Sequence, residues 1–169
     1  MEINFPPLPR HAQDDPWVVF DCEVEMYFEA QRAIERVNKQ LEGKVLPEML
    51  TLKNAVVESM VLHTRVLVDV LISKKKEDDD IGLNDLSPQW CEMDKAKGLI
   101  DELREAYGNI REPYSPCWVF NKMLAHATRQ RSNSYNYGSA LNKISDPIFS
   151  ILLELQSFTG RESLKHYLD

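Results

Sequence analysis

The sequence has few of the residues that build disulfide frameworks or structural metal sites. It contains three cysteines in 169 residues, Cys22, Cys91 and Cys117, and none of them belongs to a CxxC pair. An odd number of isolated cysteines argues against a disulfide framework and against a cysteine zinc site. We therefore expect small, reduced thiols that mostly pack inside the protein, with no bound metal and no cofactor.

Long apolar runs and a leader-like start are also lacking. Charged residues interrupt every apolar stretch before it reaches the ~20 residues that a membrane-spanning helix needs. The first residues, MEINFPPLPRHAQDDP, have no cationic start followed by an apolar run, so they do not resemble a secretory signal. These two absences predict a cytoplasmic protein that does not associate with membranes.

Positive charge is scarce as well. The chain has 20 Lys and Arg against 27 Asp and Glu, which gives a formal net charge of −7. This charge repels phosphate backbones at long range, so RNA is disfavoured as a partner. One zone departs from this balance, because five basic residues lie between positions 111 and 143: Arg111, Lys122, Arg129, Arg131 and Lys143.

No segment shows the alternation of apolar and polar residues that a half-buried strand requires. Apolar residues recur instead at helical spacing in five segments, at about 20–41, 48–73, 94–107, 117–130 and 140–158. Glycines and prolines such as Gly43, Pro47, Gly108 and Gly160 separate these segments. The sequence therefore predicts an all-α protein, a four- or five-helix bundle that is mostly antiparallel, with a long second helix at its centre.

The two ends of this scheme differ in composition. Residues 1–16 hold four of the nine prolines, and proline fixes φ and removes a backbone donor. We expect an extended N-terminal arm over residues 1–16 and a single helical-bundle domain over residues 17–169.

The apolar second helix carries ionisable residues that need an explanation. At 3.6 residues per turn, Glu58 and Arg65 lie about 20° apart, and Arg65 and Asp69 about 40° apart. Buried charges must be paired, and one guanidinium can bridge two carboxylates. We predict that these three residues form one buried or half-buried network. The alternative is that they form the polar floor of a pocket. His63 lies on a different face, about 140° from Glu58.

A second group of polar residues lies in the helix predicted at 117–130. Lys122 and His126 are four residues apart and share a face, and Arg131 follows the helix. We expect His126 to pack toward the second helix, near His63 or Arg65, in a structural role. Glu58, Asp69 and Lys122 are the candidate polar binding cluster. The candidate catalytic groups, if the protein is an enzyme, are His126, His63, Arg65 and Arg131.

These residues carry a resemblance to a known group of proteins. The runs NAVVESMVLHTRVLVDVLI and NKMLAHATRQR, with an acidic linker and Trp90 between them, resemble a family of small, mostly bacterial helical-bundle proteins for which we know no established activity. The resemblance covers about residues 52–131. It implies a helical bundle, and the family's marked positions fall on His63, Arg65, Asp69, Trp90, Lys122, His126 and Arg131.

A more distant resemblance is to the HEPN superfamily, whose members are helical bundles, often dimers, in toxin–antitoxin or phage-defence systems. Its ribonucleases carry an R-x4–6-H motif whose Arg and His support attack by the RNA 2′-hydroxyl. Here Asn121 stands where that motif would need an Arg before His126, and a literal R-x4-H occurs only in the tail, from Arg161 to His166.

Two functions from different classes remain after this comparison. The favoured hypothesis is a non-enzymatic binding or interaction protein that forms a homodimer or binds a partner protein. The alternative is a HEPN-like, metal-independent ribonuclease or nucleotide-binding protein, with His126 as the acid–base group and Arg65 or Arg131 beside a phosphate.

Overall fold

The computed structural model describes residues 15–41, 47–73, 80–124 and 137–168. These residues are 84% helical and contain no strand, which confirms the all-α prediction. The helices are α2 (Pro16–Gln40), α3 (Pro47–Leu71), α4 (Leu83–Leu86), α5 (Pro88–Cys91), α6 (Asp94–Tyr107), α7 (Pro116–Leu124), α8 (Tyr137–Thr159) and α9 (Glu162–Leu168).

Helix α2 begins earlier than the sequence suggested. The Asp15 side chain accepts a hydrogen bond from the Trp17 backbone N–H at 2.9 Å, and Pro16 occupies the first turn. An aspartate cap followed by proline is a favourable helix start, because the first-turn N–H groups have no partner inside the helix. Pro16 therefore belongs to α2 rather than to the predicted arm, and residues 1–14 lie outside the described part of the chain.

Three short helices were not expected. Helices α4 and α5 occupy the segment around Trp90 that we predicted to be irregular, and α9 follows Gly160. Local contacts start α4 and α5: the Gly82 N–H donates to the Asp85 side chain at 2.7 Å, and Pro88 is the first residue of α5. This segment buries the large side chain of Trp90, which is only 2% exposed.

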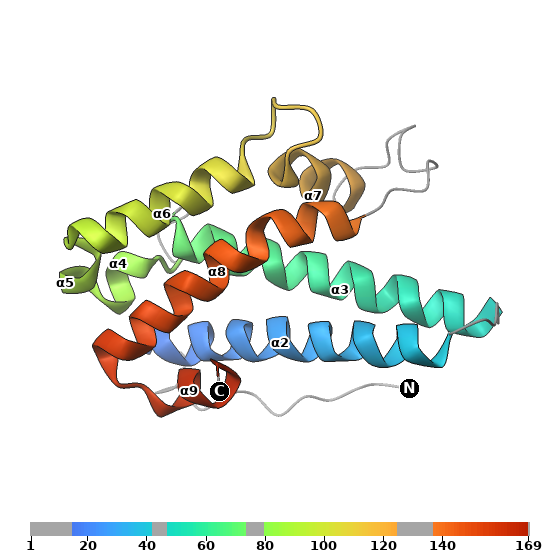
Figure 1. Cartoon of the computed structure of the whole chain (residues 1–169), viewed down its shortest axis with the longest axis horizontal. Helices are drawn as coiled ribbons and strands as arrows, with labels where there is room; N and C mark the ends of the chain where they lie inside the picture. Colours follow the sequence, from blue (N-terminus) through green and yellow to red (C-terminus); the bar gives the residue numbers. More distant parts are fainter. Residues whose placement is uncertain (1–14, 42–46, 74–79, 125–136, 169) are drawn as a thin grey trace.

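Helices α2 and α3 lie side by side and run in opposite directions, and α8 crosses them on one face (Figure 1). Helix α6 packs on α8, α7 contacts α3 and α8, and α9 returns against α2. Helix α3 thus contacts α2, α7 and α8. The largest fully buried side chains include Phe20, Tyr107, Phe120, Leu67, Leu71, Ile148 and Leu152. No described helix is both long and apolar enough to cross a membrane.

The turn between α6 and α7 depends on a glycine. Gly108 ends α6 with a φ of +69, and a Cβ there would lie 2.7 Å from the Ser115 Cβ. A left-handed φ and this close approach both favour a residue without a side chain. Ser115 then starts α7, because its hydroxyl accepts from the Trp118 N–H at 3.2 Å.

Candidate functional site

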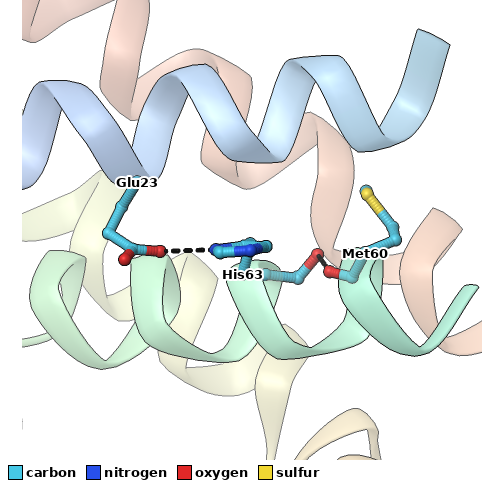
Figure 2. A network of polar contacts seen from close by, with 4 residues as sticks. Glu23, Met60 and His63 are labelled. Atoms are coloured by element: carbon cyan, nitrogen blue, oxygen red, sulfur yellow. Dashed lines mark hydrogen bonds and ion pairs between the residues drawn. The ribbon is translucent and has the colours of Figure 1, made fainter. Parts of the chain in front are cut away.

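A hydrogen-bonded pair joins the first two long helices. His63 Nδ1 on α3 lies 2.8 Å from Glu23 Oε2 on α2, and Figure 2 shows the two side chains pointing toward each other from the two helices. The two side chains are 17% and 20% exposed, so the pair is largely screened from water. Because an ionised carboxylate can only accept, Nδ1 carries the proton in this contact. The bridge fixes the position of one helix relative to the other.

His63 was a candidate from the sequence, but Glu23 was not. The available signal was its place on α2, where Glu23 lies between Phe20 and Tyr27, both of which are buried. A carboxylate at the edge of a buried stripe needs a partner. The partner lies 40 residues away in the chain, and spacing along one helix does not identify it.

A carboxylate-oriented imidazole is also an element of many hydrolytic sites, so its surroundings decide its role. In such sites the second ring nitrogen acts as a base for a nearby nucleophile. The nearest thiol in sequence is Cys22, which is exposed. Burial, and then the carboxylates of Glu23 and Glu25, raise the pKa of this thiol. A raised pKa lowers the thiolate fraction, which is the opposite of what a catalytic cysteine needs.

The three residues predicted to form one network, Glu58, Arg65 and Asp69, differ in burial. Arg65 and Asp69 are half-buried, but Glu58 is exposed, so the prediction that all three are at least half-buried is wrong for Glu58. The reason is that the Glu58 end of the stripe lies on the outer edge of α3. Leu62, on the same stripe, is 50% exposed, whereas the buried side of α3 is formed by Met60, Val61, Thr64, Leu67, Val68 and Leu71.

Glu58 instead borders a cleft between α2, α3 and the start of α8. The cleft has a volume of about 440 Å³ and combines charged groups, Lys53 and Glu58, with apolar walls from Ile34, Val57 and Leu141. The alternative that the stripe forms a polar pocket floor therefore applies to Glu58.

Arg65 and Asp69 belong to a different environment, near α6 and α7. Burial, and then Cys117 and Asp69, raise the pKa of the Tyr107 hydroxyl, while Arg65 acts in the opposite direction. The two charged residues are thus close enough to Tyr107 to influence its ionisation. The two ends of the stripe therefore lie in different surroundings.

Three further candidates lie wholly or partly outside the described part of the chain. His126 and Arg131 lie outside the described residues, and so does the side chain of Lys122, although its backbone belongs to α7. The prediction that His126 packs toward α3 stays a prediction. Within the described ranges, no three His, Cys, Asp or Glu side chains are grouped in a way that could hold a metal ion.

The Arg and the His of the R-x4-H sequence in the tail both make packing contacts. Arg161 donates from Nη2 to Asp21 Oδ2 at 3.0 Å, and its guanidinium lies over the Trp17 ring at 4.2 Å from the ring centre. His166 is exposed and contacts the ring of Tyr167. The guanidinium of Arg161 holds α9 against α2.

Comparisons of the chain with family models, with curated proteins and with solved structures give no significant match. The resemblance to HEPN proteins therefore stays a prediction.

Proposed function

We propose that the protein is a non-enzymatic interaction protein that binds a basic amphipathic helix of a partner on the outer face of the α2–α3 pair. The outer face consists of Val19, Cys22 and Met26 of α2 with Leu62 and Val66 of α3. One observation carries the proposal: apolar side chains on both helices are exposed, at 41% for Val19, 39% for Met26 and 50% for Leu62, beside the Glu23–His63 bridge.

The position of these residues on α2 follows from helix geometry. Phe20, Val24 and Tyr27 are buried and lie on one side of Glu23. Val19 and Met26, four residues before and three residues after Glu23, lie on its other side. The exposed apolar residues of α2 therefore face away from the core.

The same arrangement holds on α3. Met60, Thr64 and Leu67 are buried on one side of His63, and Leu62 and Val66 lie on the other side. Because the two helices touch through Glu23 and His63, we infer that the exposed Val19, Met26 and Leu62 and the half-buried Val66 border one shared surface. Such a surface on two neighbouring helices suits the apolar stripe of a third helix.

Charge decides which partner fits this surface. Glu25 on α2 and Glu58 on α3 are exposed carboxylates on the same two helices, and the whole chain carries a net charge of −7. A helix with Lys or Arg beside its apolar stripe is complementary to these carboxylates, and complementary charge speeds association and selects partners. The same net charge opposes a second copy of this chain and opposes RNA.

The packing roles of the ionisable groups support a non-enzymatic function. His63 is hydrogen-bonded to Glu23, and Arg161 is paired with Asp21. Both contacts hold helices together. The ribonuclease alternative then depends on His126 with Arg65 or Arg131, and a direct assay separates the two functions: the purified protein should leave labelled single-stranded RNA intact.

The binding proposal is tested with a fluorescein-labelled model helix. We expect the wild-type protein to bind an amphipathic Leu/Lys peptide and to bind a Leu/Glu peptide of the same pattern at least about tenfold more weakly. Leu62→Ser should weaken binding of the Leu/Lys peptide by about tenfold, as expected when a central apolar contact is lost. Leu153→Ser is the matched control, because Leu153 is an equally large side chain on α8 that is 46% exposed, and it should leave the affinity unchanged.

Two further readouts locate the complex. Cys22 is the exposed cysteine, so bound peptide should slow its reaction with a maleimide. Equal losses for Leu62→Ser and Leu153→Ser would show that binding is non-specific attraction to an acidic protein. A wild-type dimer in light scattering that Leu62→Ser converts to a monomer would assign the outer face to a second copy. RNA cleavage by the wild-type protein would overturn the non-enzymatic proposal itself.

A further inference from the structure

A cavity of about 630 Å³ lies where the end of α3 meets α6, the α6–α7 turn and α7. Its volume is in the range of small-molecule pockets, roughly 300–1,000 Å³. Its walls are mainly apolar, and three polar side chains, those of Arg104, Asn109 and Asn121, line it as well. The apolar lining includes Ile72, Tyr107, Ile110 and Cys117.

The charge of the lining is unusual for this acidic chain. Among the described residues, Arg104 is the only charged one that lines the cavity, and its partner Asp101 lies outside the lining. The cleft beside Glu58, by contrast, has one lysine and one glutamate in its lining. A single cation without a lining carboxylate favours a ligand with a negative charge.

Arg104 retains donors for such a ligand. Its Nη1 donates to Asp101 Oδ1 at 2.8 Å and its Nη2 to the Ile72 carbonyl oxygen at 3.1 Å. A guanidinium has five N–H donors, so these two contacts leave others without a partner among the described residues. The pair with Asp101 is 52% and 71% exposed, and exposed pairs of this kind are weak. An anion can therefore approach Arg104 without breaking a strong interaction.

The apolar walls suit a hydrocarbon group. Tyr107 and Cys117 are only 2% and 3% exposed, and Ile110 is 48% exposed. Burial is the first of the causes that raise the pKa of Tyr107, so its ring is a neutral wall at physiological pH. Asn109 adds a hydrogen-bond donor to the lining. Its Oδ1 accepts from the Arg111 N–H at 2.9 Å, and its Nδ2 is a separate donor group.

We propose that this cavity binds a small anionic amphiphile. A carboxylate head group would lie at Arg104 and Asn109, and a short hydrocarbon tail would lie against Ile72, Tyr107 and Ile110. The ligand class is a soluble fatty carboxylate. This inference does not depend on the outer face or on its partner.

The test uses octanoate as the probe and follows the backbone amides by nitrogen–proton correlation spectra of the full chain. Octan-1-ol and octylammonium are the neutral and cationic controls. We expect octanoate to shift the amides of Gly108, Asn109 and Ile110 and to bind at least tenfold more tightly than octan-1-ol, because only the carboxylate engages Arg104. Octylammonium should be the weakest of the three.

Paired variants assign the effect to the cavity. Arg104→Gln should remove the preference for octanoate over octan-1-ol. Arg111→Gln, at an exposed arginine in the same turn that does not line the cavity, should retain it. Ile110→Ser should weaken both ligands by a similar factor, and because Ile110 is half-exposed this variant should fold.

Three results would overturn the proposal. The first is equal affinity of the wild-type protein for octanoate and octan-1-ol. The second is an equal loss of octanoate binding in Arg104→Gln and Arg111→Gln. The third comes from vesicles of phosphatidylcholine and phosphatidylglycerol added in place of octanoate: shifts of the same amides would assign the site to a membrane lipid, and unmoved amides support the soluble ligand.

Discussion

The bridge between Glu23 and His63 should stabilise the fold measurably, and a double-mutant cycle can isolate its contribution. The perturbations are Glu23→Ala, His63→Ala and the double variant. The two side chains approach to 2.8 Å and are 20% and 17% exposed. Hydrogen bonds to charged groups contribute about 1.5–3 kcal/mol, and exposed pairs contribute about 0.2–1 kcal/mol. A pair that is mostly screened from water falls between these ranges, so we expect a coupling energy of about 1–2 kcal/mol.

The same chain offers a matched control for the effect of burial. Arg32 and Glu29 on α2 approach to 2.7 Å, but their side chains are 42% and 48% exposed. Their coupling should be about 0.3–0.5 kcal/mol, as for other neighbouring pairs on one helix. Urea unfolding monitored by circular dichroism gives both values from shifts of the midpoint. Equal coupling in the two cycles would refute the argument that partial burial strengthens the Glu23–His63 bridge.

Two further sets of substitutions give predictions. Gly108→Ala should destabilise the protein by about 1–3 kcal/mol, because φ is +69 and the new Cβ would meet Ser115 at 2.7 Å. In thermal melts Gly98→Ala should instead raise stability by about 0.5–1 kcal/mol, since Gly98 lies inside α6 and a Cβ there meets nothing within 4 Å. Among the described residues the buried Tyr107 hydroxyl has no nitrogen or oxygen partner, and its one side-chain contact is with the weakly bonding Cys117 sulfur, so Tyr107→Phe should cost little or stabilise. Tyr27→Phe, in contrast, loses a hydrogen bond of 3.1 Å and should cost about 1 kcal/mol. Burial raises the pKa of Tyr27 to about 12 and raises the pKa of Tyr107 as well. The pKa of tyrosine in the unfolded chain is about 10, so above that pH the native state binds more protons than the unfolded state and stability falls as pH rises. Denaturant melts across the alkaline range should show this loss, and each Phe variant should show less of it.

The long helices could be predicted because glycine, proline and apolar spacing act locally. Helix α6 has the bounds 94–107 that its sequence pattern indicated, and it ends at Gly108. The single-turn helices α4 and α5 could not be predicted in the same way. A short helix is unstable by itself, so its formation depends on tertiary contacts such as the burial of Trp90.

The candidate site was less predictable, since helical angles do not reveal which face of a helix is buried. The spacing of Glu58, Arg65 and Asp69 placed them on one stripe, but Leu62 shares that stripe and half of its surface is exposed. An apolar residue on a polar stripe was the available sign that the Glu58 end of the stripe faces outward. The Glu23–His63 contact depends on how α2 and α3 pair, and that pairing is a tertiary property.

The contact between Arg161 and Asp21 also has a kinetic consequence. The two residues are 140 positions apart, so their contact closes one of the longest loops in the chain, and the entropy of closing a loop grows with its length. This contact should therefore form late in folding, after α2, α3 and α8 have assembled. Trp17 lies directly under the Arg161 guanidinium. A change in Trp17 fluorescence in a stopped-flow refolding experiment should therefore report that final step.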